Sequence, residues 1–380
     1  MSPTWKPLTG TSRAVALEVL VHGPLSRVEL ARRMEMSQGS LTRLTKPLVD
    51  RGLLLEVNGT RGAGSGVGRP QKPLDVLATA HHFVGVKLTG ETAYGVLTTL
   101  RAEVVAQETE TFDDTSPQNV TAVISRLVSR LSTGAPSVTA VGVSLGGHAA
   151  DHQSVASAPY LHWVDVPLAA MVEAATSLPT VVENDLVALT EAESWFGAGP
   201  GLDQFAVVTV GAGVGFGLVV RGHQVTNADI GLGLVGHIPL DPNGPVCFQG
   251  HRGCSTAMLS MESIAGAVSV ALGRRVTYDQ ALDLAAAGDP AAGRVVGEAG
   301  RALGRMLALV ANFTMPRKVV LGGEGVRLVE VARGAIDDAL RADRDPKASP
   351  LVLEVRPGDF TEWARGAAVV AIQTYVLGVD

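Results

Sequence analysis

Apolar residues recur three and four positions apart in the first fifty residues, a spacing typical of amphipathic helices. The pattern predicts helices over residues 12–21, 27–34 and 38–49. Ser26 and Ser37 directly precede the second and third helices and are good N-cap residues. Glu29 lies three residues after Ser26, so we expect these two side chains to form a capping box.

After these helices the chain changes to a strand pattern. Residues 53–57 and 71–76 can form a hairpin, with the glycine-rich residues 58–70 as its long loop. Three helices followed by a two-stranded hairpin are the elements of a winged helix-turn-helix, which we assign to residues 1–76. A helical module that binds another protein is the alternative.

From residue 82 onward, short apolar strands alternate with amphipathic helices. We expect strands over 83–88, 93–98, 103–106, 138–144 and 179–183, and helices over 118–131 and 168–177. A second cycle has a strand over 205–210, a tight glycine-rich turn over 211–217 and a returning strand over 218–220. That turn is either a phosphate-binding loop or a simple hairpin turn. The two cycles predict an α/β body of two lobes that face a cleft.

Composition narrows the class of protein. The 380 residues are 46% hydrophobic and 18% charged, which is enough to bury a sizeable core without disulfides. The only cysteines are Cys247 and Cys254, which argues against a secreted disulfide scaffold. Residues 1–10 lack the apolar core of a signal peptide, and no stretch is apolar enough to span a bilayer. We therefore expect a cytoplasmic protein with no membrane partner.

The net charge of −6 is unevenly distributed along the chain. Residues 1–75 hold 11 Lys and Arg against 6 Asp and Glu, a net charge of +5, and the remaining residues carry −11. A small basic module on an acidic body is typical of a protein whose first domain binds phosphates. We therefore predict that the N-terminal module binds double-stranded operator DNA.

The third predicted helix is the one we expect to enter the major groove. Its early, outward positions carry side chains that can bond to base edges or phosphates: Ser37, Gln38, Ser40, Thr42, Arg43 and Lys46. In the hairpin loop, Arg61 and Arg69 can reach the neighbouring DNA backbone or the minor groove.

Several motifs, in order along the chain, resemble those of the ROK family of repressors and sugar kinases. They are Gly68-Arg69-Pro70, Ser157–Trp163, Glu183–Ala188, Val210–Gly217, Gly236-His237, Cys247–Cys254 and Val319–Gly325. The resemblance implies an α/β, actin-like (ribonuclease H-like) sugar-kinase fold behind the winged helix-turn-helix, assembled as a homodimer or tetramer. By the same resemblance, residues 77–190, completed by a C-terminal helix over 364–380, form the first lobe and residues 191–363 the second.

Departures from the family pattern decide the expected activity. Kinases of this family open with an Asp-x-Gly-Gly-Thr turn that holds ATP phosphates and magnesium, whereas this chain has Lys87-Leu88-Thr89-Gly90-Glu91. Lys87 cannot hold magnesium and Glu91 would repel phosphate, so we expect no enzyme activity and no ATP requirement. Asp185 is retained at the position of the family's general base, and we interpret it as a vestigial base that accepts hydrogen bonds from a ligand.

The resemblance also indicates where a ligand binds. Asn184, Asp185 and His237 match positions at which the family contacts a sugar. Leu234 and Thr256 stand where two carboxylates would accept hydrogen bonds from sugar hydroxyls. The expected effector is therefore a different sugar, a sugar phosphate or a less polar molecule, and a fully vestigial site is the alternative.

A zinc signature of the family is three-quarters complete. His237, Cys247 and Cys254 match its ligands in type and spacing, but Gln249 replaces the remaining cysteine. Glutamine is a poor zinc ligand, so the fourth ligand is either His251 or Gln249. The expected cofactor is a structural Zn²⁺ ion, and two reduced thiols packed in a loop are the alternative.

These features predict a ligand-responsive transcriptional regulator, expected to be a repressor, whose kinase-like body binds a sugar-derived effector without phosphorylating it. An active ATP-dependent sugar kinase with an attached DNA-binding head is the alternative, and a body that only mediates assembly is a third. For the regulator, we expect lobe closure around the effector to change the spacing of two DNA-binding heads.

Overall fold

In this computed structural model the described residues are 8–57, 72–135, 137–149 and 151–378, and they fall into two compact units. Unit 1 comprises Met1–Pro200 with Thr361–Asp380, and unit 2 comprises Gly201–Phe360. The predicted lobe boundary at 190/191 falls inside helix α6 (Asp185–Phe196), which is continuous. Because Ala192 and Trp195 of this helix lie in the core of unit 1, the chain leaves that unit only after Pro200.

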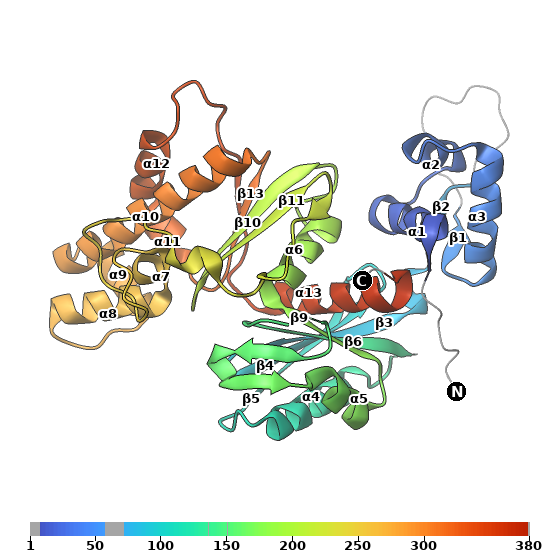
Figure 1. Cartoon of the computed structure of the whole chain (residues 1–380), viewed down its shortest axis with the longest axis horizontal. Helices are drawn as coiled ribbons and strands as arrows, with labels where there is room; N and C mark the ends of the chain where they lie inside the picture. The colour runs from blue at the N-terminus through green and yellow to red at the C-terminus, as the bar shows by residue number, and fades with distance from the viewer. Residues whose placement is uncertain (1–7, 58–71, 136, 150, 379–380) are drawn as a thin grey trace. The chain divides into compact units, whose positions relative to one another are not determined.

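The N-terminal part of unit 1, which we call the head (residues 8–76), contains the predicted helices and hairpin. The elements are α1 (Gly10–His22), α2 (Arg27–Arg33), α3 (Gln38–Asp50) and the antiparallel strands β1 (Leu54–Glu56) and β2 (Leu74–Val76). Leu41 and Leu48 of α3 are buried, as their spacing predicts. The head therefore has the element order of a winged helix-turn-helix (Figure 1).

The head shares one hydrophobic core with the rest of unit 1. Val15 and Val19 of α1 belong to the same buried cluster as Val376 and Leu377 of the C-terminal π-helical turn η4 (Gln373–Leu377). The backbone N–H of Leu8 donates to the carbonyl of Val376 at 3.1 Å. The head is thus packed and hydrogen-bonded onto its lobe.

An arginine on the lobe fastens the head a second time. Arg101 follows strand β4 (Thr92–Thr99) and donates to the carboxylate of Asp75 on β2. The same guanidinium lies 3.3 Å from the carbonyl oxygen of Val19, in the last turn of α1. Because Arg101 contacts both a helix and a strand of the head, it fixes the direction in which the head leaves the lobe.

The lobe of unit 1 is built on a five-stranded sheet of order β5-β4-β3-β6-β9. Its strands are β3 (His82–Leu88), β4, β5 (Val104–Thr111), β6 (Val138–Leu145) and β9 (Thr180–Asn184). Strands β3, β4 and β5 pair antiparallel, and β3, β6 and β9 pair parallel. Helices α4 (Pro117–Leu131) and α5 (Leu168–Thr176) contribute side chains to the core on one face of this sheet.

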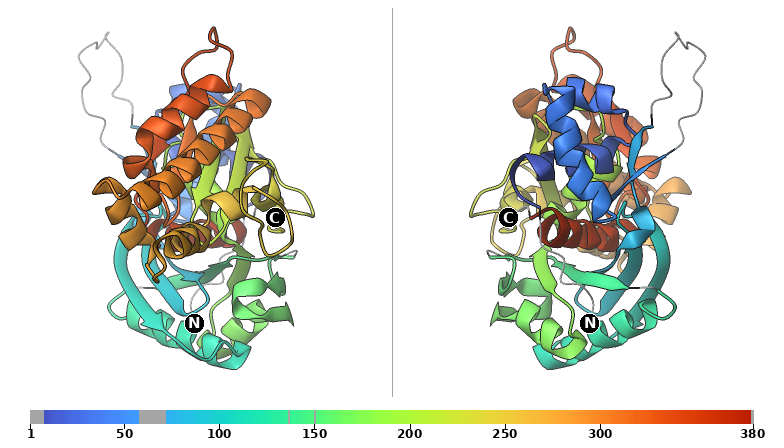
Figure 2. Two further views of the ribbon diagram at one scale, coloured as in Figure 1. Left: turned by 90° about the vertical axis from the view of Figure 1, so that its left-hand side faces the viewer. Right: turned by 90° about the vertical axis from the view of Figure 1, so that its right-hand side faces the viewer.

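Helix α13 (Thr361–Ile372) covers the other face, as Figure 2 shows. The helix comes so close to the sheet that a Cβ atom on Gly85 would lie 2.0 Å from the carbonyl oxygen of Ala364. A Cβ atom on Gly142 would lie 1.9 Å from the carbonyl oxygen of Ala367. Glycine at both strand positions is therefore what allows helix and sheet backbones to touch.

Unit 2 repeats the same sheet order as β12-β11-β10-β13-β14. The strands are β10 (Gln204–Val210), β11 (Val214–Val220), β12 (His223–Gln224), β13 (Val319–Gly322) and β14 (Leu353–Val355). The predicted seven-residue turn over 211–217 is wrong in length, because Val214–Gly217 are already paired with β10. Only Gly211–Gly213 form the turn, so the hairpin interpretation is the correct one for its backbone.

The helices of unit 2 are α7 (Ser255–Leu259), α8 (Met261–Leu272), α9 (Tyr278–Ala286), α10 (Pro290–Thr314), α11 (Arg327–Val331) and α12 (Arg333–Ala342). In unit 1, a small hairpin of β7 (Val155–Ala158) and β8 (Trp163–Val166) was not predicted. No helix among the described residues has the length and hydropathy needed to cross a bilayer.

Candidate functional site

The start of helix α3 is fixed by its two serines. The Ser37 hydroxyl oxygen accepts the backbone N–H of Ser40 at 3.2 Å, and the two hydroxyls lie 2.9 Å apart. Both side chains therefore hold the N-terminus of the helix, and their hydroxyls remain at its outer end. At α2, Ser26 caps as predicted, but the carboxylate of Glu29 lies 3.6 Å from Arg33 instead of completing the expected capping box.

The outward face of α3 carries the remaining predicted DNA contacts. Gln38, Thr42, Arg43 and Lys46 are all exposed. Arg27 and Arg33, on α2, are paired with Glu56 and Glu18. Arg43 and Lys46 enter no ion pair within the part of the chain that the structure describes. The free positive charge of α3 therefore lies where a phosphate backbone can reach it.

Arg61 and Arg69 lie outside the described residues, so their predicted contacts with DNA stay a prediction.

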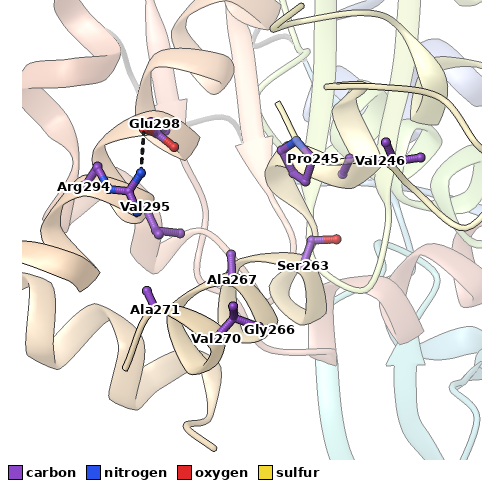
Figure 3. Close-up of a pocket in the computed structure, with 11 residues that line it drawn as sticks. Pro245, Val246, Ser263, Gly266, Ala267, Val270, Ala271, Arg294, Val295 and Glu298 are labelled. Carbon is purple, nitrogen blue, oxygen red and sulfur yellow. Dashed lines mark ion pairs between the residues drawn. The ribbon is translucent and has the colours of Figure 1, made fainter. Parts of the chain in front are cut away.

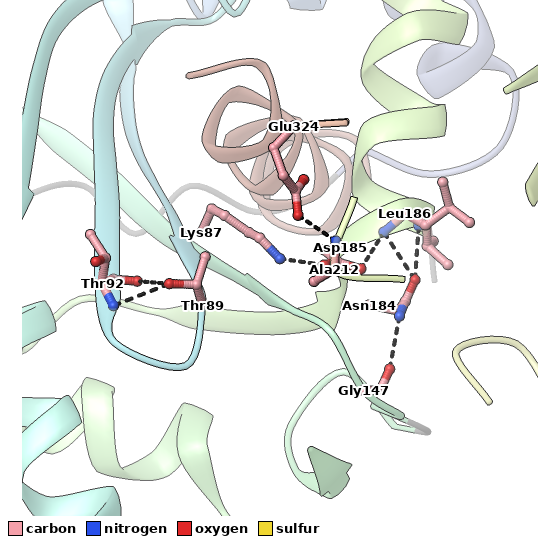
Figure 4. A network of polar contacts seen from close by, with 10 residues as sticks. Lys87, Thr89, Thr92, Gly147, Asn184, Asp185, Leu186, Ala212 and Glu324 are labelled. Atoms are coloured by element: carbon pink, nitrogen blue, oxygen red, sulfur yellow. Dashed lines mark hydrogen bonds and ion pairs between the residues drawn. The ribbon is translucent and has the colours of Figure 1, made fainter. Parts of the chain in front are cut away.

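Lys87 and Asp185 form a buried ion pair in unit 1. Lys87 lies near the end of β3 and Asp185 opens α6, and the lysine ammonium donates to Oδ2 of the aspartate (Figure 4). Their side chains are 6% and 16% exposed. The ammonium also lies 5.3 Å from the ring centre of Trp363 on α13, a cation–π distance. Lys87, which stands where the resemblance expects a carboxylate, thus engages Asp185, the residue predicted to be a vestigial base.

Asn184 serves as the N-cap of α6. Its side-chain oxygen accepts the backbone N–H groups of Leu186 and Val187 at 3.0 and 3.1 Å. Its amide nitrogen donates to the carbonyl of Gly147 at 2.8 Å. These contacts use the oxygen and one N–H of the amide, so a ligand would meet its second N–H.

The turn between β3 and β4 is closed on itself. The Thr89 hydroxyl exchanges hydrogen bonds with the backbone N–H and carbonyl of Thr92, each at 3.1 Å. Glu91 is exposed at its tip. A compact turn carrying a carboxylate is poorly suited to surround a phosphate.

Three potential metal ligands meet in unit 2. Nδ1 of His237 lies 3.6 Å from Sγ of both Cys247 and Cys254. Zn–S and Zn–N bonds of about 2.3 and 2.0 Å give a tetrahedron with edges of about 3.6 Å, so these separations fit a zinc ion. Nδ1 of His251 lies 3.7 Å from Sγ of Cys247, whereas Gln249 is exposed to solvent. The ligand atoms of His237, Cys247 and Cys254 all lie within 4.8 Å of one another, and His251 is not part of that group, so the identity of a fourth ligand stays a prediction.

The electrostatics of this cluster suit a cation. Burial lowers the pKa of His237, which keeps the imidazole neutral and able to bind metal. Burial alone would raise the pKa of Cys247, but the backbone N–H groups of Gln249 and His251 directed at its sulfur lower that pKa overall. Burial raises the pKa of Cys254, whose thiol is therefore the harder of the two to ionise without a metal.

Leu234 and Thr256 stand where the resemblance expects carboxylates, and neither side chain accepts a charge-assisted bond. Leu234 is 66% exposed. The Thr256 hydroxyl donates to the carbonyl of Gly236 at 2.6 Å, beside His237.

Two polar contacts, those of Glu183 and Glu324, were not predicted from the sequence. Glu183, buried at the end of β9, accepts the Asn184 backbone N–H at 2.6 Å and lies 2.9 Å from Nδ1 of His152. Glu324 reaches across from the loop after β13 to the Gly211–Gly213 turn (Figure 4). The contacts of His152 and Glu324 have no signal in local sequence, because each joins residues far apart in the chain.

A shallow hollow of about 480 Å³ lies on unit 2 between α8 and α10 (Figure 3). Its lining is mostly apolar, with Val270 from α8 and Val295 from α10. The charged groups on its rim, Arg294 and Glu298, lie 4.0 Å from each other. None of the residues named above as site candidates lines this hollow.

Comparisons with known proteins give a consistent result. A model of the ROK family matches residues 83–369. The chain is 26% identical over 342 residues to the DNA-binding transcriptional repressor Mlc of Escherichia coli K12, covering 86% of this chain and 84% of that protein. It is 23% identical over 308 residues to the xylose repressor of Bacillus subtilis, covering 80% and 79% of the two chains.

Solved structures show the same relation. The crystal structure of a ROK family transcriptional regulator, described as a homolog of the Escherichia coli Mlc protein, is 25% identical with a TM-score of 0.82 and covers 97% of this chain and 96% of its own. A ROK family glucokinase from Streptomyces griseus is 24% identical with a TM-score of 0.65. This match covers 76% of this chain and 98% of the glucokinase. The body of this chain therefore has the fold of that kinase.

Proposed function

Because the chain belongs to the ROK family, we propose that it is a transcriptional repressor that binds operator DNA through its head and a sugar-derived effector through its body. The observation that carries the proposal is the exposed face of α3, where Arg43 and Lys46 are free of ion pairs within the described residues. We place this regulator in the cytoplasm, where its proposed partner would be.

In the DNA complex, α3 would lie in the major groove. Gln38 and Arg43 are suited to base edges, and Lys46 to a phosphate. Ser37 and Ser40 would offer their hydroxyls to a phosphate at the capped end of the helix. Arg61 and Arg69 of the hairpin loop would contact the flanking backbone or minor groove. A homodimer or tetramer would present two heads to a two-fold symmetric operator.

For the effector we propose contacts with Asn184, Asp185 and His237, the three residues that the family resemblance indicates. A carboxylate oxygen of Asp185 already engaged by the Lys87 ammonium is a poor acceptor for the proton of a sugar hydroxyl. The body would therefore bind its effector without transferring a phosphoryl group, and no ATP would be required.

We further propose that His237, His251, Cys247 and Cys254 hold a structural zinc ion. When bound, the ion would join the loop after η3 (Leu234–His237) to the start of α7. The second nitrogen of the His237 ring would remain available to the effector.

The test measures binding of the full chain to DNA fragments from upstream of its own gene. Fluorescence anisotropy gives the affinity over a range of salt concentrations. The double variant Arg43→Ala with Lys46→Ala should bind more weakly and lower the slope of log K against log salt by about 2, because each removed cation would neutralise one phosphate. Lys347→Ala, which removes one exposed positive charge from unit 2, is the control and should leave the slope unchanged.

Sugars and sugar phosphates are then added to the wild-type complex, and ATP consumption is followed in parallel. A sugar that releases the DNA without ATP turnover supports the proposal. Failure to bind any upstream fragment at moderate salt, or hexose-dependent ATP turnover that Asp185→Asn abolishes, would contradict it.

A further inference from the structure

A hollow of about 480 Å³ lies in unit 1, at the joint between the head and its lobe. Sites for small molecules typically have volumes of about 300–1,000 Å³. The head contributes the last turn of α1 to the lining, and the lobe contributes the turn between β4 and β5, the end of α6 and the first turns of α13. The lining includes Val21, Arg101, Glu103, Trp195, Phe196 and Arg365.

The turn between β4 and β5 is fixed by Thr99. The N–H of Thr99 donates to the carbonyl of Glu103 at 3.0 Å. The Thr99 hydroxyl oxygen accepts the N–H groups of Arg101 and Glu103 at 3.2 and 3.3 Å. Because the backbone is held on both sides of Ala102, one preorganised turn presents Arg101 and Glu103 to the hollow.

Arg365 of α13 joins two walls of the hollow. Its Nε donates to the carbonyl of Ala102 at 2.9 Å, and its Nη2 donates to the carbonyl of Phe196 at 3.1 Å. Its charge is matched by the carboxylate of Glu362, which accepts from Nη1. All three guanidinium nitrogens of Arg365 therefore hold the lining together, and its charge is already neutralised.

Two other charged groups of the lining remain available to a ligand. Arg101 uses Nη2 for Asp75 and for the carbonyl of Val19, but its Nε is buried without a partner among the described residues. A buried donor without an acceptor is costly, so an acceptor that enters the hollow would be bound favourably. Glu103 is exposed, accepts the Thr99 hydroxyl at 3.4 Å and enters no ion pair within the part of the chain that the structure describes.

The remaining lining is largely apolar. Trp195 and Phe196 form an edge-to-face pair with ring centres 6.0 Å apart, and Val21 adds an aliphatic side chain from the head. Walls of this kind suit an apolar side chain. The two arginines and two glutamates of the lining balance one another, so the hollow favours a ligand without net charge.

We propose that this hollow binds a free α-amino acid with a large apolar side chain. The ligand's carboxylate accepts from the free N–H groups of Arg101, and its ammonium pairs with Glu103. Its side chain lies against Trp195 and Phe196. Such a molecule contacts both α1 and the turn between β4 and β5, so it fastens the head to the lobe.

The proposal goes beyond the regulatory function and does not rest on it. Its readout is the binding of an amino acid to the full chain without DNA or sugar. A chain that failed to bind operator DNA would give the same result.

Titration calorimetry tests the two charged contacts from the side of the ligand. Wild type should bind L-phenylalanine at least about tenfold more tightly than N-acetyl-L-phenylalanine, which lacks the ammonium. The same difference is expected for L-phenylalaninamide, which lacks the carboxylate. Absence of L-phenylalanine binding, or equal affinity for all three compounds, would overturn the proposal.

A variant tests the same contact from the side of the protein. Glu103→Gln keeps the size of an exposed side chain, and it should weaken L-phenylalanine binding at least about tenfold. Binding of N-acetyl-L-phenylalanine should not change, because that compound has no ammonium to pair with Glu103. Glu330→Gln removes an exposed charge from α11, outside the hollow, and should match wild type. Equal L-phenylalanine affinity in wild type and Glu103→Gln would contradict the assignment.

Hydrogen–deuterium exchange locates the bound molecule. L-phenylalanine should slow amide exchange in residues 19–22 and 99–104 of wild type, and it should have no such effect in Glu103→Gln. The first segment belongs to the head and the second to the lobe, so protection of both is expected for a molecule bound at the joint. Protection confined to unit 2 would place the ligand elsewhere and refute the proposed site.

Discussion

At the scale of single residues, the ion pair of Lys87 with Asp185 is the feature on which the proposed lack of kinase activity depends. Its two charges have unequal access to water, since the Lys87 side chain is 6% exposed and that of Asp185 is 16% exposed. A buried charge that loses its partner is costly, and the cost grows as water is excluded. The two halves of the pair should therefore respond differently to mutation.

We expect Asp185→Asn to lower the free energy of unfolding by about 2–4 kcal/mol, because it leaves the lysine ammonium buried without its counter-ion. Lys87→Met should cost less, since solvent can partly hydrate Asp185. In urea denaturation, the double variant Lys87→Met with Asp185→Asn should have a higher free energy of unfolding than Asp185→Asn alone. Additive losses would mean that the two side chains are not coupled.

At the scale of elements, the loop between η3 and α7 should depend on metal. If the predicted ligands hold an ion, its binding free energy would stabilise the folded loop. We expect one zinc per chain in the purified protein, measured by plasma mass spectrometry, and a lower melting temperature after chelation.

Single substitutions in that loop identify the fourth ligand. His251→Ala should weaken zinc retention against a competing chelator by at least about tenfold, whereas Gln249→Ala should leave it unchanged. The opposite order would assign the position to Gln249, and equal retention in both would limit the site to three protein ligands.

The sequence predicted the regular elements well and the contacts between them poorly. Buried strands such as β3, with all seven residues buried, and helices with clear caps such as α3 have strong local patterns. The hairpin of β7 and β8 was missed because its strands are four residues long and carry polar side chains. The turn after β10 was predicted too long because glycines at 215 and 217 suggest a turn, yet pair in a strand.

The candidate sites divide in the same way. The candidate metal cluster was predictable because its histidine and cysteines lie close in sequence. The pair of Lys87 with Asp185 joins residues 98 positions apart, and Glu324 meets the turn from 112 positions away. The residue type of Lys87 is enough to predict a loss of magnesium binding, but its partner Asp185 follows only from the parallel pairing of β3, β6 and β9.

At the scale of the whole molecule, stability should depend on pH through a partly buried glutamate. Burial raises the pKa of Glu191 on α6 above its ordinary value of 4.5, although a hydrogen bond from Gln373 of η4, at 2.7 Å, opposes the shift. The nearby charge of Glu183 raises it further. In the folded state the proton is therefore held more tightly than in the unfolded chain.

The direction in which stability changes with pH follows from the raised pKa of Glu191 in the folded state. The contribution of Glu191 is fully present below pH 4.5 and is lost as the pH rises through the folded-state pKa. Glu191→Gln keeps an acceptor for Gln373 without the charge, so it should stabilise the protein at pH 8 and change little at pH 4. Melting curves of the wild-type protein and Glu191→Gln between pH 4 and pH 8 test this pH dependence. A stabilisation that does not grow with pH would contradict the assignment.

The joint between the head and its lobe has a consequence for the thermodynamics of DNA recognition. A head on a loose tether would lose orientational entropy each time it met the operator. Here Leu8, Arg101 and the core around η4 fix the orientation during folding, so that entropy is already lost before DNA arrives. Any change that loosened this joint would restore the entropic cost and weaken binding, without touching a single residue of α3.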